Sequence, residues 1–197
     1  MRKTAITASA VLVMFLTAAG CTGSSPPASG ELLFPKVYVT AYSWFDNTPA
    51  GSPSISHPVL HRTAGGAGTY ENPVTLAVGH SLETGEDVMD IPAGTRIYVP
   101  SIRRYFMVED TCGDGPSPED GPCHSGAEEF GDASLWIDLW IGGEGGSAAL
   151  AQRCAKAITG VHIVILNPGQ NYLVADGAGV IHDGRCDADY GNDVITR

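Results

Sequence analysis

The sequence has few basic residues: 11 Lys and Arg stand against 22 Asp and Glu, and the formal net charge is −11. A surface with this balance repels the phosphates of nucleic acids, so we expect no nucleic-acid partner. Long periodic apolar runs are also scarce, whereas the chain has 25 glycines and 13 prolines among its 197 residues. This composition is typical of one turn-rich, mainly β domain that is large enough for a real core.

Several motifs of catalytic and metal sites are missing. The G-x-S-x-G turn of serine hydrolases does not occur, and no closely spaced Cys/His pairs follow the pattern of a zinc site. His80 and His124 could join Asp110 as metal ligands, but solvent-facing loop histidines are commoner. The acidic loop 114–120 lacks the EF-hand pattern of a calcium site. We predict a monomer with neither a metal nor a cofactor.

The first 20 residues have the pattern of an export signal. Arg2 and Lys3 precede an apolar stretch, 5–19, that is too short for a comfortable membrane span. The segment ends Thr-Ala-Ala-Gly-Cys at 17–21, which resembles the cleavage box of bacterial lipoproteins, where Cys21 is acylated and becomes residue one. Ordinary signal-peptidase cleavage is the alternative. We predict an extracytoplasmic protein, anchored by lipid to the outer face of the cell membrane or secreted.

The predicted organisation has three parts: residues 1–20 are a lipoprotein-type signal peptide, 21–33 a Ser/Pro/Gly tether, and 34–190 the folded domain. A long loop at 46–70 is of a length that is usually functional or disordered, and a helix is expected at 147–158, with Ser147 as its cap. Runs rich in β-branched and aromatic residues predict strands at 36–44, 74–78, 96–99, 104–109, 135–141, 161–166 and 172–175.

Five cysteines are an odd number, and assigning Cys21 to the lipid leaves four. In an exported chain four cysteines favour two disulfides over free thiols, and the sequence allows three pairings. We predict Cys112–Cys123, because both bound one short Gly/Pro loop, and Cys154–Cys186 as the second pair.

Asp138 is the first candidate for chemistry. In a strand it projects to the same side as Trp136 and Trp140, while the aliphatic residues between them form the expected core face. Apolar neighbours raise the pKa of a carboxylate, as a general acid needs, and indoles can stack on sugar rings. The alternative is that the tryptophans are core and that Asp138 caps a turn or pairs with an arginine.

Two further carboxylates are candidates. Asp110 is in phase with Phe106 and Val108, so a continuous strand would turn it inward, where it needs hydrogen bonds. It is either part of the site or a satisfied structural residue at a strand end. Asp46 follows the polar and aromatic face of the 36–44 strand. It could supply a carboxylate opposite Asp138, or it could begin a turn.

The order of the motifs resembles the double-psi β-barrel superfamily, and within it the three-aspartate domains of lytic transglycosylases and cell-wall-binding proteins, rare lipoprotein A, expansins and family 45 endoglucanases. The motifs are TAY at 40–42, LAVG at 76–79, IPAGT at 91–95, VEDTCGDG at 108–115 and IDLW at 137–140, followed by a helix and a closing strand. The likeness covers residues 36–166 and is nearest to secreted bacterial and fungal proteins with an EDTCGDG signature. It implies a mainly β fold, a six-stranded double-psi β-barrel with one or two short helices, long loops and two disulfides.

The resemblance also implies roles. Asp138 aligns with the aspartate that acts as acid in the endoglucanases and transglycosylases, Asp110 aligns with a supporting aspartate, and Asp46 lies near the endoglucanase base. Two departures count against peptidoglycan cleavage. Gly79-His80 replaces the first aspartate of the three-aspartate group, and a disulfide-bounded acidic loop replaces its GGAIKG run.

We therefore expect a protein that binds or cleaves a β-linked polysaccharide of a cell wall, peptidoglycan included, or of the environment. It would be a glycoside hydrolase or resemble a lytic transglycosylase. Inverting hydrolysis would place the carboxyls of Asp46 and Asp138 about 6.5–9.5 Å apart. The alternative is a noncatalytic glycan- or protein-binding module, like expansins or barrel inhibitors. The residues expected to contact the substrate are Thr40, Tyr42, Trp44, His80, Trp136 and Trp140.

Overall fold

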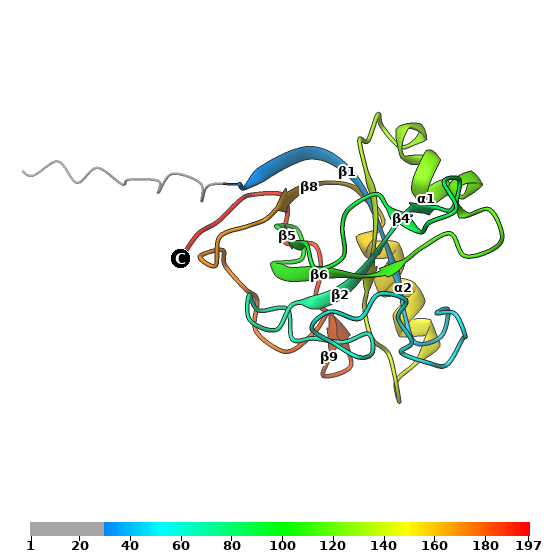
Figure 1. Ribbon diagram of the computed structural model, residues 1–197. Helices are drawn as coiled ribbons and strands as arrows, with labels where there is room; N and C mark the ends of the chain where they lie inside the picture. Colours follow the sequence, from blue (N-terminus) through cyan, green and yellow to red (C-terminus); the bar gives the residue numbers. More distant parts are fainter. Residues whose placement is uncertain (1–29) are drawn as a thin grey trace, which may run out of the picture.

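The computed structural model describes residues 30–197. Six of its strands close into one barrel (Figure 1). Their order around the barrel is β1-β7-β2-β6-β5-β8. The strands are β1 (Leu32–Tyr42), β2 (Val74–Val78), β5 (Arg96–Val99), β6 (Arg104–Thr111), β7 (Trp136–Trp140) and β8 (Gly160–Leu166). The predicted fold class, mainly β with a six-stranded barrel, is confirmed. The predicted signal peptide, the lipidation site at Cys21 and most of the tether lie outside the described residues.

Short hairpins and helices lie between the barrel strands and after the last of them. Two short hairpins and several helical turns lie in the connections, and the longest helix is α2 (Ala148–Ile158). The hairpins pair β3 (His80–Ser81) with β4 (Val88–Met89), and β9 (Ile181–His182) with β10 (Arg185–Cys186). The other helical turns are η1 (Pro118–Asp120), α1 (Pro122–Ser125) and η2 (Ala127–Glu129). No helix in the described part of the chain is long and apolar enough to cross a membrane.

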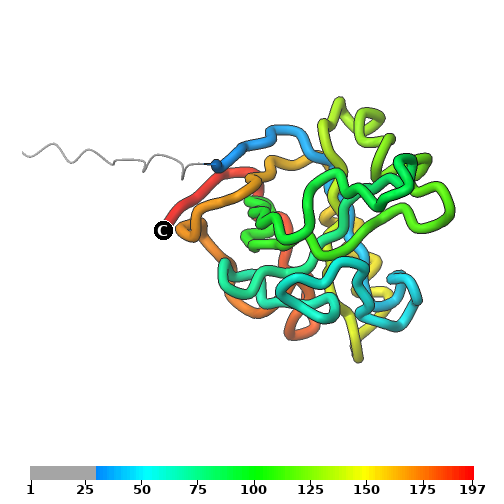
Figure 2. The backbone as a smooth tube through the Cα atoms, viewed as in Figure 1, coloured from blue at the N-terminus to red at the C-terminus, as the bar shows by residue number. Residues whose placement is uncertain are grey.

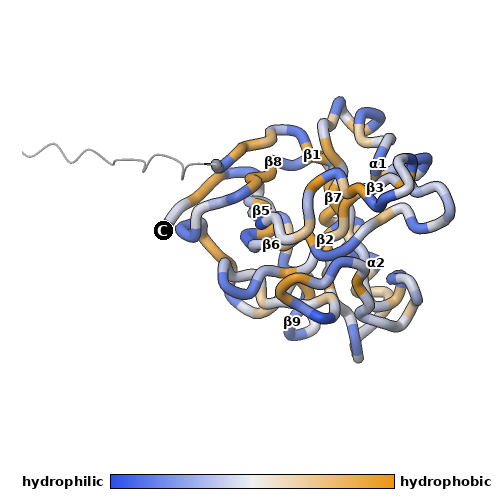
Figure 3. The backbone as a smooth tube through the Cα atoms, in the orientation of Figure 1, coloured by the Kyte–Doolittle hydropathy of each residue, from blue (hydrophilic) through white to orange (hydrophobic). Residues whose placement is uncertain are grey.

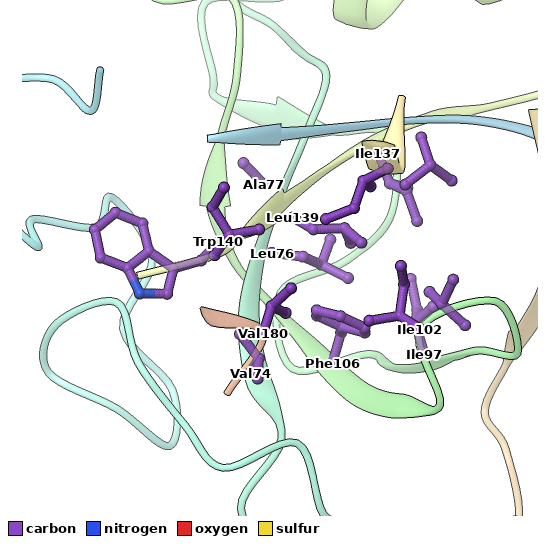
Figure 4. Packing of buried hydrophobic residues seen from close by; sticks show 14 of the residues in the cluster. Val74, Leu76, Ala77, Ile97, Ile102, Phe106, Ile137, Leu139, Trp140 and Val180 are labelled. Carbon is purple, nitrogen blue, oxygen red and sulfur yellow. The ribbon is translucent and has the colours of Figure 1, made fainter. Parts of the chain in front are cut away.

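The barrel interior is filled by alternate strand residues, as the period of two requires. Val37 and Val39 of β1 and Ile137 and Leu139 of β7 are all 0% exposed. The predicted core faces of these two strands are therefore confirmed. Figure 3 shows the hydrophobic colour concentrated on the barrel strands and the hydrophilic colour on the loops and turns, and Figure 4 shows the apolar side chains that meet between β2, β5, β6 and β7.

Both predicted disulfides are present, Cys112–Cys123 and Cys154–Cys186. The first fastens α1 beside the end of β6, and the second ties α2 to β10. Helix α2 follows the prediction closely and packs on β1. Ser147 occupies the N-cap position, as predicted, but its side chain makes no capping hydrogen bond.

One strand boundary and one predicted strand differ from the prediction. Strand β1 begins at Leu32 rather than 36, because Pro35 sits at a register shift between Phe34 and Val37 in the pairing with β8. A bulge of this kind tolerates a residue without a backbone N–H. The strand predicted at 172–175 is wrong: Tyr172 makes one isolated bridge to Thr196 instead.

The C-terminal segment returns along the barrel and ends beside the start of β1 (Figure 2). Arg104, at the start of β6, holds this segment. Its guanidinium is fully buried and donates to the carbonyl oxygens of Gly179 at 3.0 Å and Asp176 at 2.8 Å, and to the carboxylate of Asp187 at 2.8 Å. A buried arginine with this many acceptors is a structural tie between the barrel and the chain end.

Candidate functional site

The candidate site is built on a row of paired residues across four neighbouring strands. Thr40 on β1 pairs with Asp138 on β7, and Ala77 on β2 pairs with Asp138 on one side and with Asp110 on β6 on the other. Directly opposed residues on neighbouring strands lie within side-chain reach of each other. Because Ala77 carries only a methyl group, it leaves space between the two carboxylates.

A β-bulge determines which residues face each other in this row. The pairing of β2 with β6 shifts between Leu76, which faces Val108, and Ala77, which faces Asp110. Glu109 is thereby left without a partner on β2, and Asp110 takes the place opposite Ala77. Bulges of this type recur beside active sites because they re-aim a side chain. Strand phase in the sequence does not show the extra residue.

Three members of the row, Ala77, Asp110 and Asp138, form one wall of a cavity of about 400 Å³. Residues 46–48 and 54–56 of the long loop and residues 111–114, at the end of β6 and just after it, form the other walls. Four aspartates line the cavity together with hydroxyl and amide side chains: Asp46, Asp110, Asp114 and Asp138. Asp46, Asp110 and Asp138, the three predicted catalytic carboxylates, therefore line the same cavity, although Asp46 and Asp138 are 92 positions apart in the chain.

Asp138 has the environment of a general acid. Burial raises the pKa of Asp138 to about 7, the hydrogen bond from Thr40 opposes this rise, and the nearby charges of Asp46 and Asp110 add to it. Thr40 Oγ1 donates to Asp138 Oδ1 at 2.7 Å, and Trp136 Nε1 donates to the same Thr40 oxygen at 2.8 Å. Since Thr40 directs its proton at Oδ1, a proton on the neutral carboxyl group of Asp138 belongs on Oδ2.

Asp110 has a different environment, although it is only 7% exposed. Its Oδ2 accepts from the hydroxyl of Tyr42 at 2.9 Å, and its Oδ1 accepts from the backbone and the hydroxyl of Ser56 and from the backbone of Thr111 at 2.9–3.0 Å. Burial raises the pKa of Asp110, and these hydrogen bonds oppose the rise. Burial also raises the pKa of Tyr42 well above its usual value, so this phenol remains a donor. Asp110 accepts four hydrogen bonds and Asp138 accepts one, so Asp110 has the lower pKa of the two aspartates.

Asp46 begins a turn, one of the two alternatives that the sequence left open, and it also lines the cavity. Its Oδ1 accepts from the backbone and the hydroxyl of Ser43, at 2.7 and 2.6 Å, which fixes the turn after β1. The residue is exposed and lines the same cavity as Asp138. Its Oδ2, which accepts no hydrogen bond from any residue between 30 and 197, is available to a ligand or a water molecule.

Glu109 holds the long loop against the barrel, a role that the sequence did not indicate. Its carboxylate is 0% exposed and accepts from the backbone N–H groups of Leu60 and His61 at 2.7 and 2.8 Å. The imidazole of His61 lies 2.7 Å from its second oxygen. One strand residue therefore fixes the part of the loop that carries Ser56 to Asp110. The length of the loop was the one signal in the sequence that it has a function.

Most of the six residues expected to contact a substrate lie behind the cavity lining or elsewhere. Of the six, Tyr42 lines the cavity. Thr40 and Trp136 act behind Asp138 through the hydrogen bonds described above, and Trp136 stands edge-on to Tyr38 rather than forming an open platform. Trp44 is partly buried against the core outside the cavity.

Trp140 and His80 are corrections to the predicted site. Trp140 is only 5% exposed, because Tyr42 packs edge-on against it and Val180 of the C-terminal segment lies beside it at the edge of the core cluster (Figure 4). A buried indole offers no face to a sugar ring. His80, on β3, is 7% exposed, and its Nδ1 lies 2.6 Å from Asp87 Oδ1, outside the cavity.

Within residues 30–197, no group of three or more His, Cys, Asp or Glu side chains is arranged to hold a metal ion. His124, one of the sequence's metal candidates, instead lies 2.6 Å from the carboxylate of Asp90 through its Nδ1.

The chain belongs to the family described as the DDB_G0273701 N-terminal domain, whose model matches residues 34–187. It is 33% identical over 114 residues to an uncharacterised protein of Dictyostelium discoideum, DDB_G0273701/DDB_G0273221, in a match that covers 58% of this chain and 39% of that protein. The chain thus spans well under half the length of this curated relative. No solved structure matches the chain.

Proposed function

We propose that this member of the family binds or cleaves a β-linked polysaccharide of a cell wall or of the environment, with Asp138 as its general acid. The observation that carries the proposal is the pKa of about 7 of Asp138, in a cavity that it shares with the better hydrogen-bonded Asp110. Two carboxyl groups whose environments separate their pKa values are what acid–base cleavage of a glycosidic bond requires.

In the proposed reaction, each carboxylate has one task. Asp138 gives its Oδ2 proton to the glycosidic oxygen as the bond to the leaving sugar breaks. Asp110, held by Tyr42 and Ser56, stays an anion and stabilises the positive charge that develops on the ring. Asp46 supplies its Oδ2 as the base for an attacking water, which corresponds to the inverting arrangement.

We further propose that the barrel is of the double-psi type and that the chain is exported. The parallel pairs β1–β7 and β2–β6 within an otherwise antiparallel closed barrel support the first proposal. The two disulfides support the second, since such bonds persist in oxidising compartments. Lipid attachment at Cys21 remains a prediction from the sequence.

The test is incubation of the purified protein with a panel of polysaccharides and peptidoglycan, scoring both pull-down and released ends. Asp138→Asn should reduce released ends at least about 100-fold, because it removes the acid proton but preserves shape. Asp132→Asn is the matched control, since this carboxylate is exposed and pairs only with Lys36. Cleavage that survives in the Asp138 variant would refute the assignment of the acid.

The second candidate function is a noncatalytic module for a protein partner. The side chains of Val59 and Leu60, in the part of the loop held by Glu109, are 56% and 49% exposed, and fixed apolar side chains of this kind suit a protein surface. In the same panel, this function predicts neither pull-down by any glycan nor released ends.

A further inference from the structure

None of the four aspartates of the cavity forms an ion pair with another described residue. No lysine, arginine or histidine of the described chain lines the cavity. Elsewhere, several carboxylates pair with an arginine or an imidazole: Glu109 with His61, Asp187 with Arg104, Asp90 with His124, and Asp87 with His80. Clustered carboxylates without a counter-charge destabilise a fold, so the four aspartates gathered in this cavity indicate a functional requirement.

The hydrogen bonds of the cavity leave specific oxygens open. Asp110 is saturated by four donors, and one oxygen each of Asp46 and Asp138 is occupied by Ser43 and Thr40. The second oxygen of Asp46 and the exposed carboxylate of Asp114 accept no hydrogen bond from other described residues. The second oxygen of Asp138 is kept for the acid proton, so the open acceptors come from two different walls of one cavity, and a ligand with several donors could reach them together.

We propose that this cavity selects a β-linked glycan with free amino groups, that is, a deacetylated amino sugar, over its neutral N-acetylated form. The inference rests on the proposed function and adds the chemical class of the substrate. An ammonium group has three donors and no acceptor, so it matches unpaired carboxylates and supplies the missing counter-charge.

The other lining residues favour a sugar amine over other cations. Hydroxyl and amide side chains surround the carboxylates and suit the hydroxyl groups of a sugar ring: Asn47, Thr48, Ser54, Ser56 and Thr111. A bound metal ion is disfavoured, since no described group of three ligands meets the geometry. A cationic peptide would need apolar pockets for its side chains, and Ile55 and Ala77 are the two aliphatic residues that line the cavity.

The experiment compares two ligands of equal length by calorimetric titration at about pH 5.5, where free amines are protonated and exposed carboxylates are ionised in general. The ligands are a fully deacetylated β-1,4-linked glucosamine oligosaccharide and its fully N-acetylated counterpart. The deacetylated form should bind at least about tenfold more tightly at low ionic strength, and this preference should shrink when salt screens the charges.

Asp114→Asn tests the origin of the preference. It should weaken binding of the deacetylated ligand roughly three- to tenfold and leave the N-acetylated ligand unchanged, because only a charge is lost. Asp120→Asn is the matched control, an exposed aspartate in the same disulfide-bounded loop that does not line the cavity.

Three results would overturn the inference. Equal binding of both oligosaccharides would remove the charge selectivity but leave the proposed function standing. Equal binding by tetralysine would show that charge alone, without the sugar, is recognised. Binding of neither oligosaccharide, while the protein pulls down or cleaves a neutral polymer from the panel, would exclude the amino-sugar class. Failure with every glycan would refute the proposed function as well.

Discussion

Asp138 is a residue whose proposed role and whose contribution to stability act against each other. Its pKa of about 7 in the folded protein lies above the value of about 3.9 of an unfolded aspartate. The stability that this difference provides is fully present below about pH 4, where both states are protonated. It is lost as the pH rises through about 7, because the folded protein must then ionise a poorly solvated group.

The Asp138→Asn variant should therefore be more stable than the unchanged protein at alkaline pH. Asparagine cannot ionise, so we expect the free energy of unfolding to rise by roughly 1–3 kcal/mol at about pH 8, a range discounted for the partial exposure of the carboxyl group. At about pH 4 the two proteins should differ little. Urea titrations at both pH values measure the difference. A variant that is less stable at pH 8 would show that Asp138 is a structural residue.

At the scale of elements, the barrel and the long loop depend on each other through Glu109. Burial tends to raise the pKa of this carboxyl, but the hydrogen bonds from His61 and Leu60 outweigh it and the pKa is lowered. For His61, burial lowers the pKa, yet the contacts with Asn72 and Glu109 leave it raised. Glu109 therefore stabilises the fold above its unfolded pKa of about 4.3 and loses this effect as the pH falls. His61 stabilises it below about 6.5 and loses this effect as the pH rises.

Glu109→Gln should release the loop. The substitution leaves the backbone N–H groups of residues 59–61 and the imidazole of His61 facing an amide, and we expect a loss of about 3 kcal/mol in unfolding free energy. Hydrogen exchange of these backbone amides should accelerate, and the loss should be largest between about pH 4.5 and 6.5, where both groups contribute.

Glu71→Gln is the control for this prediction, since Glu71 is exposed in the same connection. Unchanged exchange rates at 59–61 in the Glu109 variant would mean that the loop is held by other contacts.

For the whole molecule, Arg104 joins the barrel to the C-terminal segment. The Cys154–Cys186 disulfide fastens the same segment to α2, so the chain end is held from two sides. Arg104→Met should cost about 3–5 kcal/mol, because it removes a buried cation, leaves several carbonyl oxygens without their donor, and leaves Oδ2 of Asp187 without its arginine partner. Arg153→Met, on the exposed face of α2, should have little effect. Thermal unfolding of the two variants checks this, and similar melting temperatures would contradict it.

The sequence by itself determined the local features. Runs of β-branched and aromatic residues placed β1, β2, β6 and β7, and strand alternation gave the core faces of β1 and β7. The helical period placed α2, and the short Gly/Pro loop identified the Cys112–Cys123 pair. These features depend on residues that are neighbours along the chain, so they can be predicted from periodicity and spacing. The grouping of Asp46, Asp110 and Asp138 followed from family resemblance, and the tertiary structure places all three around one cavity.

Only the tertiary structure decided the environment of each side chain. Trp140 lies on the predicted side of its strand, yet it is buried in the core cluster, where Tyr42 packs against it. Arg104 lies at the start of a strand, where a charged residue is expected at the surface. It is nevertheless fully buried, and it donates to residues 176, 179 and 187 of the C-terminal segment. The bulge at Glu109 gives Asp110 its partner across β2, and the four uncompensated aspartates meet only when two loops close on the barrel. Burial and charge pairing depend on contacts between distant segments, which local sequence patterns do not specify.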